Sequence, residues 1–227
     1  MKLILDAGGV IVYPALGSWR YGVAMTQSPV IAPTLGGEAY TRAHAACAHL
    51  AREDVRIDTE REELAMRRAY LEAMNARVPW DLPPQELDAL ARDFVENPRR
   101  MGVYADAAKY LPRFQSRFGL GLLSDTMPSL RRVLECAGLW RYFDAHVFST
   151  DVGALKPDPA MYARILELLG ARAQDCLFVD DLERNLRGAQ AAGMRAVQMA
   201  RSEDAALWSG PVVHDFAELE AYAESVA

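Results

Sequence analysis

The 227-residue sequence has few cysteines and no long hydrophobic run. Cys47, Cys136 and Cys176 are odd in number and widely spaced, a pattern that predicts no disulfide framework and favours a reducing compartment. No apolar stretch approaches the roughly 18 residues that a membrane-spanning helix needs. The strand-like run at residues 2–5 also leaves no room for a signal peptide. We therefore expect a cytoplasmic protein with no membrane-spanning segment.

Positive charge is scarce as well, and lysine in particular. The net charge is −6 and the isoelectric point is near 5.3, whereas proteins that bind nucleic acids need clustered positive charge. We therefore expect no nucleic-acid partner. Only Lys2, Lys109 and Lys156 supply lysine among the 25 basic residues, so a lysine with distinctive neighbours is more informative here than an arginine.

Short apolar runs alternate with helical segments from about residue 100 onward, a pattern typical of βαβ units and a parallel sheet. The residues between 15 and 99 differ, because they are rich in alanine, arginine and glutamate, and their apolar residues recur at helical spacing between prolines. The sequence predicts an α/β fold, in which residues 1–14 and 100–227 form a doubly wound parallel sheet and residues 15–99 are inserted as an α-helical cap domain. A second apolar run, at residues 10–13, follows the first strand. The expected strands are residues 2–5, 121–123, 145–148, 176–179 and 196–199.

Polar side chains follow these apolar runs directly. Asp6 comes after the first, Ser124 after the second, and Asp180 and Asp181 stand at the end of the fourth, while Lys156 follows the third after a short loop. In an open parallel sheet, ligands bind beyond the carboxyl ends of the strands. Carboxylates suit Mg²⁺, and a lysine and a hydroxyl suit phosphate oxygens. The pattern therefore predicts a site for phosphoryl transfer.

Four segments, in order, resemble the motifs of the haloacid dehalogenase-like superfamily. They are Asp6-Ala-Gly-Gly-Val-Ile, Leu-Leu-Ser124-Asp, Lys156-Pro-Asp-Pro, and Phe-Val-Asp-Asp181 with Asn185 after it. Residues 15–99 stand where the helical cap of this superfamily is inserted. The resemblance implies a Rossmann-like core in which Asp6 is the nucleophile.

The resemblance also implies roles for the other residues. Ser124 would bind the transferring phosphate, and Lys156 would steady the charges of the nucleophile and the phosphate. Mg²⁺ would be held by Asp6, the backbone carbonyl of Gly8 and the acidic pair, with Asp181 as the direct ligand and Asp180 behind it. The expected reaction is hydrolysis of a small phosphorylated metabolite, such as a sugar phosphate, through an aspartyl-phosphate. We expect a monomer or a homodimer.

The sequence departs from the common family pattern at Gly8. Most phosphatases of the superfamily have a second aspartate at this position, which acts as the general acid and base. Family branches with glycine here include sugar-1-phosphate phosphatases and members without an assigned activity. The proton of the leaving group then needs another donor, for which Asp125 and His44 are the candidates.

Two other functions stay open. A 2-haloacid dehalogenase also uses an aspartate nucleophile and lacks the second aspartate, but it needs no metal and normally lacks the acidic pair. A non-catalytic member of the fold would only bind a phosphorylated ligand or a partner protein.

The candidate residues also have purely structural interpretations. Asp6 could cap a turn, the two glycines after it could permit a turn with positive φ, and Ser124 could cap a helix that begins near residue 127. One of the two adjacent aspartates could cap the helix that contains Asn185.

Other potential ligands are expected to be packing residues. His44 and Cys47 share a helix face, whereas His49 points elsewhere, so we predict helix packing and no metal site. We expect Cys136 and Cys176 to lie in the core.

Overall fold

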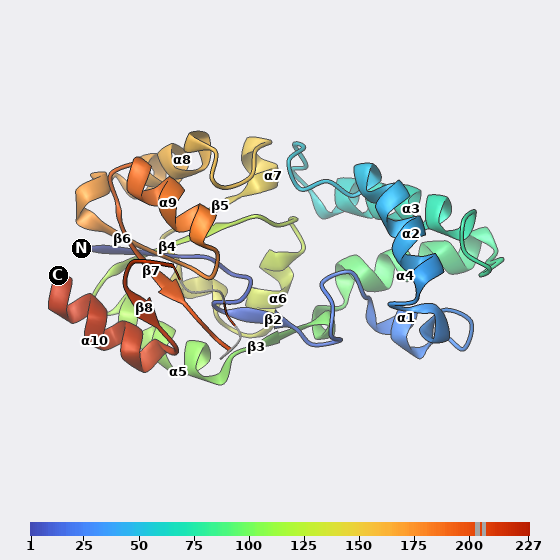
Figure 1. Cartoon of the computed structure of the whole chain (residues 1–227), viewed down its shortest axis with the longest axis horizontal. Coiled ribbons are helices and arrows are strands. Elements are labelled where there is room, and N and C mark those ends of the chain that lie inside the picture. The colour runs from blue at the N-terminus through green and yellow to red at the C-terminus, as the bar shows by residue number, and fades with distance from the viewer. Residues whose placement is uncertain (203–204, 206–207) are drawn as a thin grey trace.

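The computed structural model describes residues 1–202, 205 and 208–227, and these residues contain a six-stranded parallel sheet with the order β5-β4-β1-β6-β7-β8 (Figure 1). The predicted α/β architecture and its five core strands are confirmed. β8 was not predicted; it is only two residues long and pairs with β7. The strands are β1 (Lys2–Leu5), β4 (Gly119–Ser124), β5 (Ala145–Phe148), β6 (Cys176–Asp180), β7 (Arg195–Met199) and β8 (Val212–Val213).

Helices cover both faces of the sheet, which explains why its strands are apolar on both sides. In β1, Leu3 and Leu5 point to one face and Ile4 to the other, as the alternation of a strand requires. The first face packs against α5 (Ala105–Gln115), α6 (Leu130–Cys136) and α10 (Phe216–Val226), and the second against α8 (Pro159–Leu169) and α9 (Glu183–Ala191). A short helix, α7 (Ser149–Val152), follows β5.

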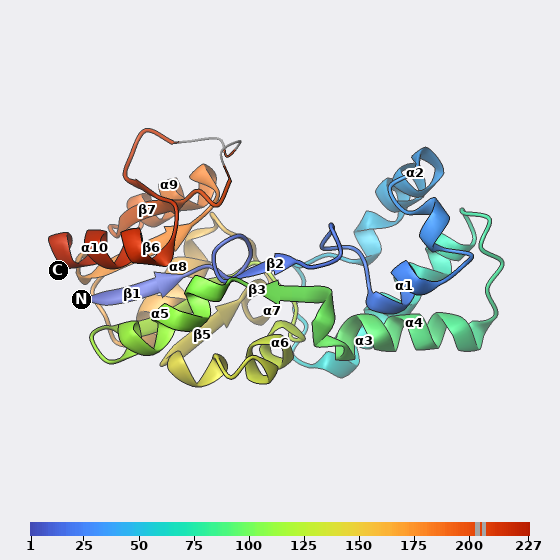
Figure 2. The same cartoon turned by 90° about the horizontal axis from the view of Figure 1, so that it is seen from below.

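A two-stranded antiparallel ribbon carries the chain away from the sheet and back again. β2 (Val12–Pro14) pairs with β3 (Met101–Val103), with Val12 opposite Val103. Figure 2 shows the two strands side by side between the sheet and the remaining helices. The ribbon holds the two ends of the inserted segment together.

The segment between β2 and β3 is helical and has its own hydrophobic cluster. It contains α1 (Val23–Gln27), α2 (Glu38–Cys47), α3 (Glu60–Asn75) and α4 (Pro84–Glu96), and its cluster includes Tyr40, Cys47, Tyr70 and Trp80. A capping box at Thr59 and Glu62 starts α3. Because this cluster is separate from the two clusters on the sheet, the helices form a second packed unit.

Polar contacts, most of them buried, dock this unit onto the sheet layers. The carboxylate of Glu63 on α3 accepts hydrogen bonds from the backbone N–H (2.8 Å) and the hydroxyl (2.7 Å) of Ser129, just before α6. Arg100 donates to the same hydroxyl at 2.9 Å. Glu60 at the start of α3 pairs with Arg132 on α6. These contacts fix the helices beside the carboxyl ends of the strands.

The two cysteines that were expected in the core differ in their burial. Cys176 is buried as predicted, but Cys136 is exposed, because the buried face of α6 is formed by Leu130, Val133 and Leu134. No helix in the described ranges is both long and apolar enough to cross a membrane.

Candidate active site

The predicted site residues meet where the sheet changes direction. β1 lies between β4 and β6, so the chain runs to one side of β1 first and to the other side later, which opens a crevice at the carboxyl ends. Asp6 directly follows β1, and Ser124 and Asp180 are the last residues of β4 and β6. The structure therefore brings together side chains that are far apart in the sequence.

Lys156 connects the two aspartates across this crevice. Its buried ammonium donates hydrogen bonds to Asp6 Oδ1 (2.8 Å), Asp180 Oδ2 (2.7 Å) and the carbonyl of Leu123 (3.1 Å). Its three N–H donors are thus all satisfied. Burial favours the neutral amine, but the carboxylates of Asp180 and Asp6 outweigh this and raise the pKa of Lys156 above its ordinary value. The side chain is therefore a fixed positive charge.

The carboxylate of Asp125 positions the loop that carries Lys156. Its Oδ1 accepts the backbone N–H of Lys156 at 2.9 Å, which ties the Lys156 loop to the end of β4. Ser124 lies beside it and is buried, but it does not cap a helix, because α6 begins six residues later behind Ser129. The capping interpretation of Ser124 is therefore wrong.

The two adjacent aspartates have different surroundings. Asp180 is fully buried, and both of its oxygens are occupied, by Lys156, by the amide of Asn185 (3.0 Å) and by the backbone N–H of Leu182 (2.9 Å). Asp181 is only partly buried and faces the pocket. Neither is the N-cap residue of α9, which is Leu182. Of the pair, Asp181 has the carboxylate that a ligand can reach.

The glycine pair after Asp6 divides into two distinct positions. Gly9 has φ of +70°, and a Cβ added there would lie 2.5 Å from Asp181 Oδ2, so only glycine fits. Gly8 has no positive φ, and a Cβ there would meet Trp19 at 3.6 Å and Asp6 Oδ2 at 4.0 Å, which are ordinary contacts. The expectation of positive φ thus holds for Gly9 alone. The Gly8 carbonyl accepts no hydrogen bond within the described part of the chain.

Negative charge at the site exceeds positive charge. Ligand atoms of Asp6, Asp180 and Asp181 all lie within 4.8 Å of one another, and Lys156 is the cation in contact with them. Burial raises the pKa of Asp6, with Asp180 adding to the effect and Lys156 opposing it, and burial and Asp180 raise the pKa of Asp181. A cluster of oxygens with excess negative charge and a free backbone carbonyl fits a hard divalent cation such as Mg²⁺.

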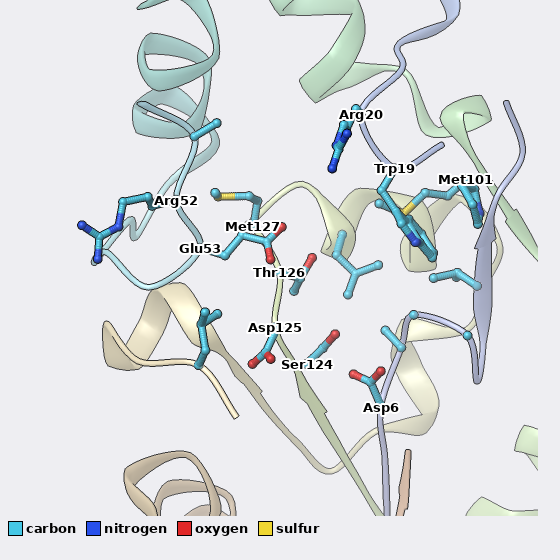
Figure 3. A pocket seen from close by; sticks show the side chains of 18 of the residues that line it. Asp6, Trp19, Arg20, Arg52, Glu53, Met101, Ser124, Asp125, Thr126 and Met127 are labelled. Carbon is cyan, nitrogen blue, oxygen red and sulfur yellow. The ribbon is translucent and has the colours of Figure 1, made fainter. Parts of the chain in front are cut away.

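A pocket of about 860 Å³ lies over this cluster, between the sheet and the inserted helices. Figure 3 shows the Asp6 and Ser124 side chains pointing into it from the strand ends, with Trp19 and Arg20 coming from the opposite side. Glu53 projects into the pocket from the loop before α3, whereas Arg52 points away. The inserted segment thus supplies one whole wall.

The residues of this wall were not predicted from the sequence. Trp19, Arg20, Glu53, Arg67 and Arg100 line the pocket, and none belongs to a motif. His44, a candidate proton donor from the sequence, also lines the pocket and hydrogen-bonds Tyr70 Oη through Nδ1 (2.7 Å).

The carboxyl group of Glu53 is less acidic than usual. More than a third of its surface is exposed, and its side chain projects into the pocket. Enclosure and the neighbouring Asp125 carboxylate raise the pKa of Glu53 to about 7.

Comparison with known proteins agrees with the fold and the motifs. The family model of the haloacid dehalogenase-like hydrolases matches residues 3–193, and the chain therefore belongs to this family. It is similar to a phosphatase of Mycobacterium tuberculosis (39% identity over 44% of this chain) and to phosphoserine phosphatase of Thermus thermophilus (34% over 52%). These alignments span only 47% and 49% of the two relatives. Enolase-phosphatase E1 of a Bradyrhizobium species is 28% identical over 97% of each chain.

Solved structures share the fold at lower identity. A 2-haloacid dehalogenase from Pseudomonas syringae superimposes over the whole of both chains with a TM-score of 0.70 at 22% identity. A putative haloacid dehalogenase-like hydrolase from Bacillus subtilis, bound to magnesium, has a TM-score of 0.66 at 17% identity over 98% of each chain. Both similarities concern the fold.

Proposed function

We propose that the protein is a Mg²⁺-dependent phosphatase that hydrolyses a small phosphate monoester, such as a sugar phosphate, through an aspartyl-phosphate on Asp6. The observation that carries the proposal is the placement of Asp6, with one carboxylate oxygen held by Lys156, at the floor of a pocket that Ser124 and Asp181 also line. Phosphatases among the relatives of the chain support it.

The first step is attack of an Asp6 oxygen on phosphorus. The new Asp6 O–P bond forms while the P–O bond to the leaving group breaks, and the leaving oxygen takes the electron pair and then a proton. Water then attacks the phosphorus and releases inorganic phosphate and the Asp6 carboxylate. The covalent route divides one difficult displacement into two easier ones.

Lys156 and Ser124 support both steps electrostatically. The fixed ammonium lowers the cost of bringing a phosphate dianion against a carboxylate, and the Ser124 hydroxyl can donate to a phosphoryl oxygen. Asp6, the Gly8 carbonyl and Asp181 would hold the metal, and Asp180 would orient Lys156. When bound, Mg²⁺ neutralises charge on the phosphoryl group.

The inserted helices would act as a cap domain over residues 1–14 and 100–227. They close one side of the pocket, so they can exclude water and select the leaving group. We infer that the substrate is a free metabolite and that the protein works in the cytoplasm as a monomer or a homodimer.

The remaining question for the mechanism is the proton of the leaving group. Gly8 supplies none, Asp125 is committed to the Lys156 loop, and burial lowers the pKa of His44. We infer that Gly8 leaves the nucleophile without a proton donor beside it and that leaving groups stable as anions are therefore preferred.

The rival function is a metal-independent 2-haloacid dehalogenase, which Gly8 and the structural neighbours favour. The Asp180–Asp181 pair speaks against it, because uncompensated carboxylates at the site would repel a haloacid carboxylate.

Hydrolysis of p-nitrophenyl phosphate tests the proposal. Activity should require Mg²⁺, stop in EDTA and return with excess metal. Asp6→Asn should abolish it while the circular dichroism spectrum is retained. Full hydrolysis in EDTA, or halide release from 2-chloropropionate without metal, would contradict the proposal.

A further inference from the structure

Two arginines in the wall formed by the inserted segment have unsatisfied polar groups. Arg67 on α3 and Arg100 at the end of the segment both stack on the ring of Phe94, with guanidinium carbons 3.5 and 4.4 Å from its centroid. The Nε of each is buried without a hydrogen-bond partner. Within the described ranges, Arg67 makes no hydrogen bond or ion pair through its side chain, and Arg100 makes only the bond to Ser129. Buried donors of this kind call for a ligand.

Their charges are poorly compensated as well. Because both guanidinium groups lie against the same ring, their carbons are no more than about 8 Å apart. The side chain of Arg20, also without a partner in the described residues, enters the same pocket. Glu63 and Glu53 are the nearby acids, but Glu63 is hydrogen-bonded to Ser129 and neither forms an ion pair within 4 Å of these arginines. Positive charge is thus in excess at this wall.

The electrostatics of the buried groups agree with this imbalance. Burial lowers the pKa of Arg67, and burial together with Arg67 lowers the pKa of Arg100 to about 10. Burial and the Arg20 and Arg67 charges also lower the pKa of His44. Burial is the largest cause of each shift, and for the two arginines it outweighs the opposing carboxylates of Glu63 and Glu53.

We propose that Arg67 and Arg100 form a subsite for a second anionic group, a carboxylate on the leaving group of the phosphate ester. The inference deepens the proposed phosphatase function and rests on it. Both arginines line the same pocket as Asp6 and Ser124, so one ligand can place its phosphate at the strand ends and its carboxylate at the opposite wall. The planar guanidinium fork matches a carboxylate in two parallel hydrogen bonds. Because Glu53 and Glu63 offset part of the positive charge, a monoanion fits better than a second phosphate.

The test compares 3-phosphoglycerate with glycerol 3-phosphate as competitive inhibitors of p-nitrophenyl phosphate hydrolysis in Mg²⁺. The two compounds differ only in a carboxylate that replaces a hydroxymethyl group. Since a hydrogen bond to a charged group is worth about ten- to a hundredfold in affinity, the inhibition constant of 3-phosphoglycerate should be lower by that factor. Equal constants in the wild-type protein would overturn the proposal.

Variants identify the residues. Arg67→Met should bring the ratio of the two constants close to one, and Arg67→Lys should leave an intermediate ratio, because it keeps the charge and loses the fork. Arg61→Met is the matched control: Arg61 is an exposed arginine on α3 outside the pocket, so the ratio should not change. A ratio that survives in folded Arg67→Met and Arg100→Met would also refute the subsite.

Two further comparisons separate the possible outcomes. The first compares the fall in inhibition constant from fructose 6-phosphate to fructose 1,6-bisphosphate with the fall from glycerol 3-phosphate to 3-phosphoglycerate. If the fall is larger for the fructose phosphates, the subsite prefers a phosphate and the proposal is wrong. If the protein hydrolyses no phosphate ester at all, the proposed function fails. The subsite is then tested by thermal stabilisation, for which 3-phosphoglycerate should exceed glycerol 3-phosphate, and equal shifts would contradict it.

Discussion

Replacing Gly8 by aspartate should give the site the proton donor that it lacks. The backbone accepts a side chain here, since φ is not positive and a Cβ would make only van der Waals contacts with Trp19 and Asp6. A carboxyl group at this position would lie near Asp6. Two charges about 4 Å apart repel by about 4 kcal/mol at an effective dielectric constant of 20, so the new carboxyl should stay protonated near neutral pH and be able to donate.

The expected gain depends on the leaving group. General acid catalysis contributes about 10²–10⁴-fold, or roughly 3–5 kcal/mol of barrier. The gain should be largest for an alkoxide and small for an aryl oxide. In the wild-type protein, log kcat/KM should fall steeply as the pKa of the leaving group rises. In Gly8→Asp the slope should flatten, and kcat/KM for glycerol 3-phosphate should increase by most of the factor that general acid catalysis contributes.

The assay is kcat/KM for a series of aryl and alkyl phosphates under conditions where chemistry limits the rate. Gly8→Asn is the matched control, because it has the same volume but no proton to donate at neutral pH. A flat series in the wild-type protein would refute the missing donor and direct attention to Glu53. A folded Gly8→Asp variant whose slope equals that of Gly8→Asn would refute the role of position 8.

Three further predictions concern metal binding, backbone strain and pH. Saturation with Mg²⁺ at about 100 times its Kd should stabilise the fold by about 2.7 kcal/mol, and Asp181→Asn should lose this shift in a thermal melt. Gly9→Ala should destabilise the protein by at least about 1–2 kcal/mol, because φ is +70° there and the new Cβ would clash with Asp181, whereas Gly8→Ala should be close to neutral in the same denaturant titration. The pKa of Glu53 rises from its ordinary 4.5 to about 7, so the folded protein binds more protons than the unfolded chain in this interval and loses stability as pH increases through it. Glu53→Gln should remove the part of that loss that Glu53 causes, while Asp6 and Asp181, whose pKa values are also raised, contribute to it in both proteins. Equal changes in the melting temperatures of the two proteins from about pH 5 to 8 would contradict the assignment.

The sheet could be predicted because the apolar pattern that identifies each strand lies within the strand itself. Runs such as residues 176–179 are apolar on both faces and stand between helical segments, which is sufficient to identify a parallel strand. β3 and β8 are three and two residues long and owe their structure to a partner strand, so nothing within them indicates a strand. The conformation of Gly9, as distinct from Gly8, likewise depends on the position of Asp181.

The floor of the site could be predicted and its opposite wall could not. The topology of a parallel sheet places the residues at the carboxyl ends of its strands along one edge. Asp6, Ser124 and Asp181 therefore lie close together whatever the conformation of the loops. Arg67 and Glu53 reach the pocket because α3 docks beside the strand ends, partly through the contact of Glu63 with Ser129. That docking depends on contacts between segments that are distant in the sequence. The sequence of an arginine-rich helix does not show which of its residues make such contacts.

Acid-quenched turnover with peptide mapping tests the central claim most directly. The protein is mixed with p-nitrophenyl phosphate and Mg²⁺, quenched during turnover and digested with trypsin, which cleaves after Lys2 and Arg20 and releases residues 3–20. We expect a phosphoryl group on this peptide at Asp6, which disappears in the absence of Mg²⁺ and in Asp6→Asn. A phosphoryl group on another peptide, or turnover by Asp6→Asn at the wild-type rate, would contradict it.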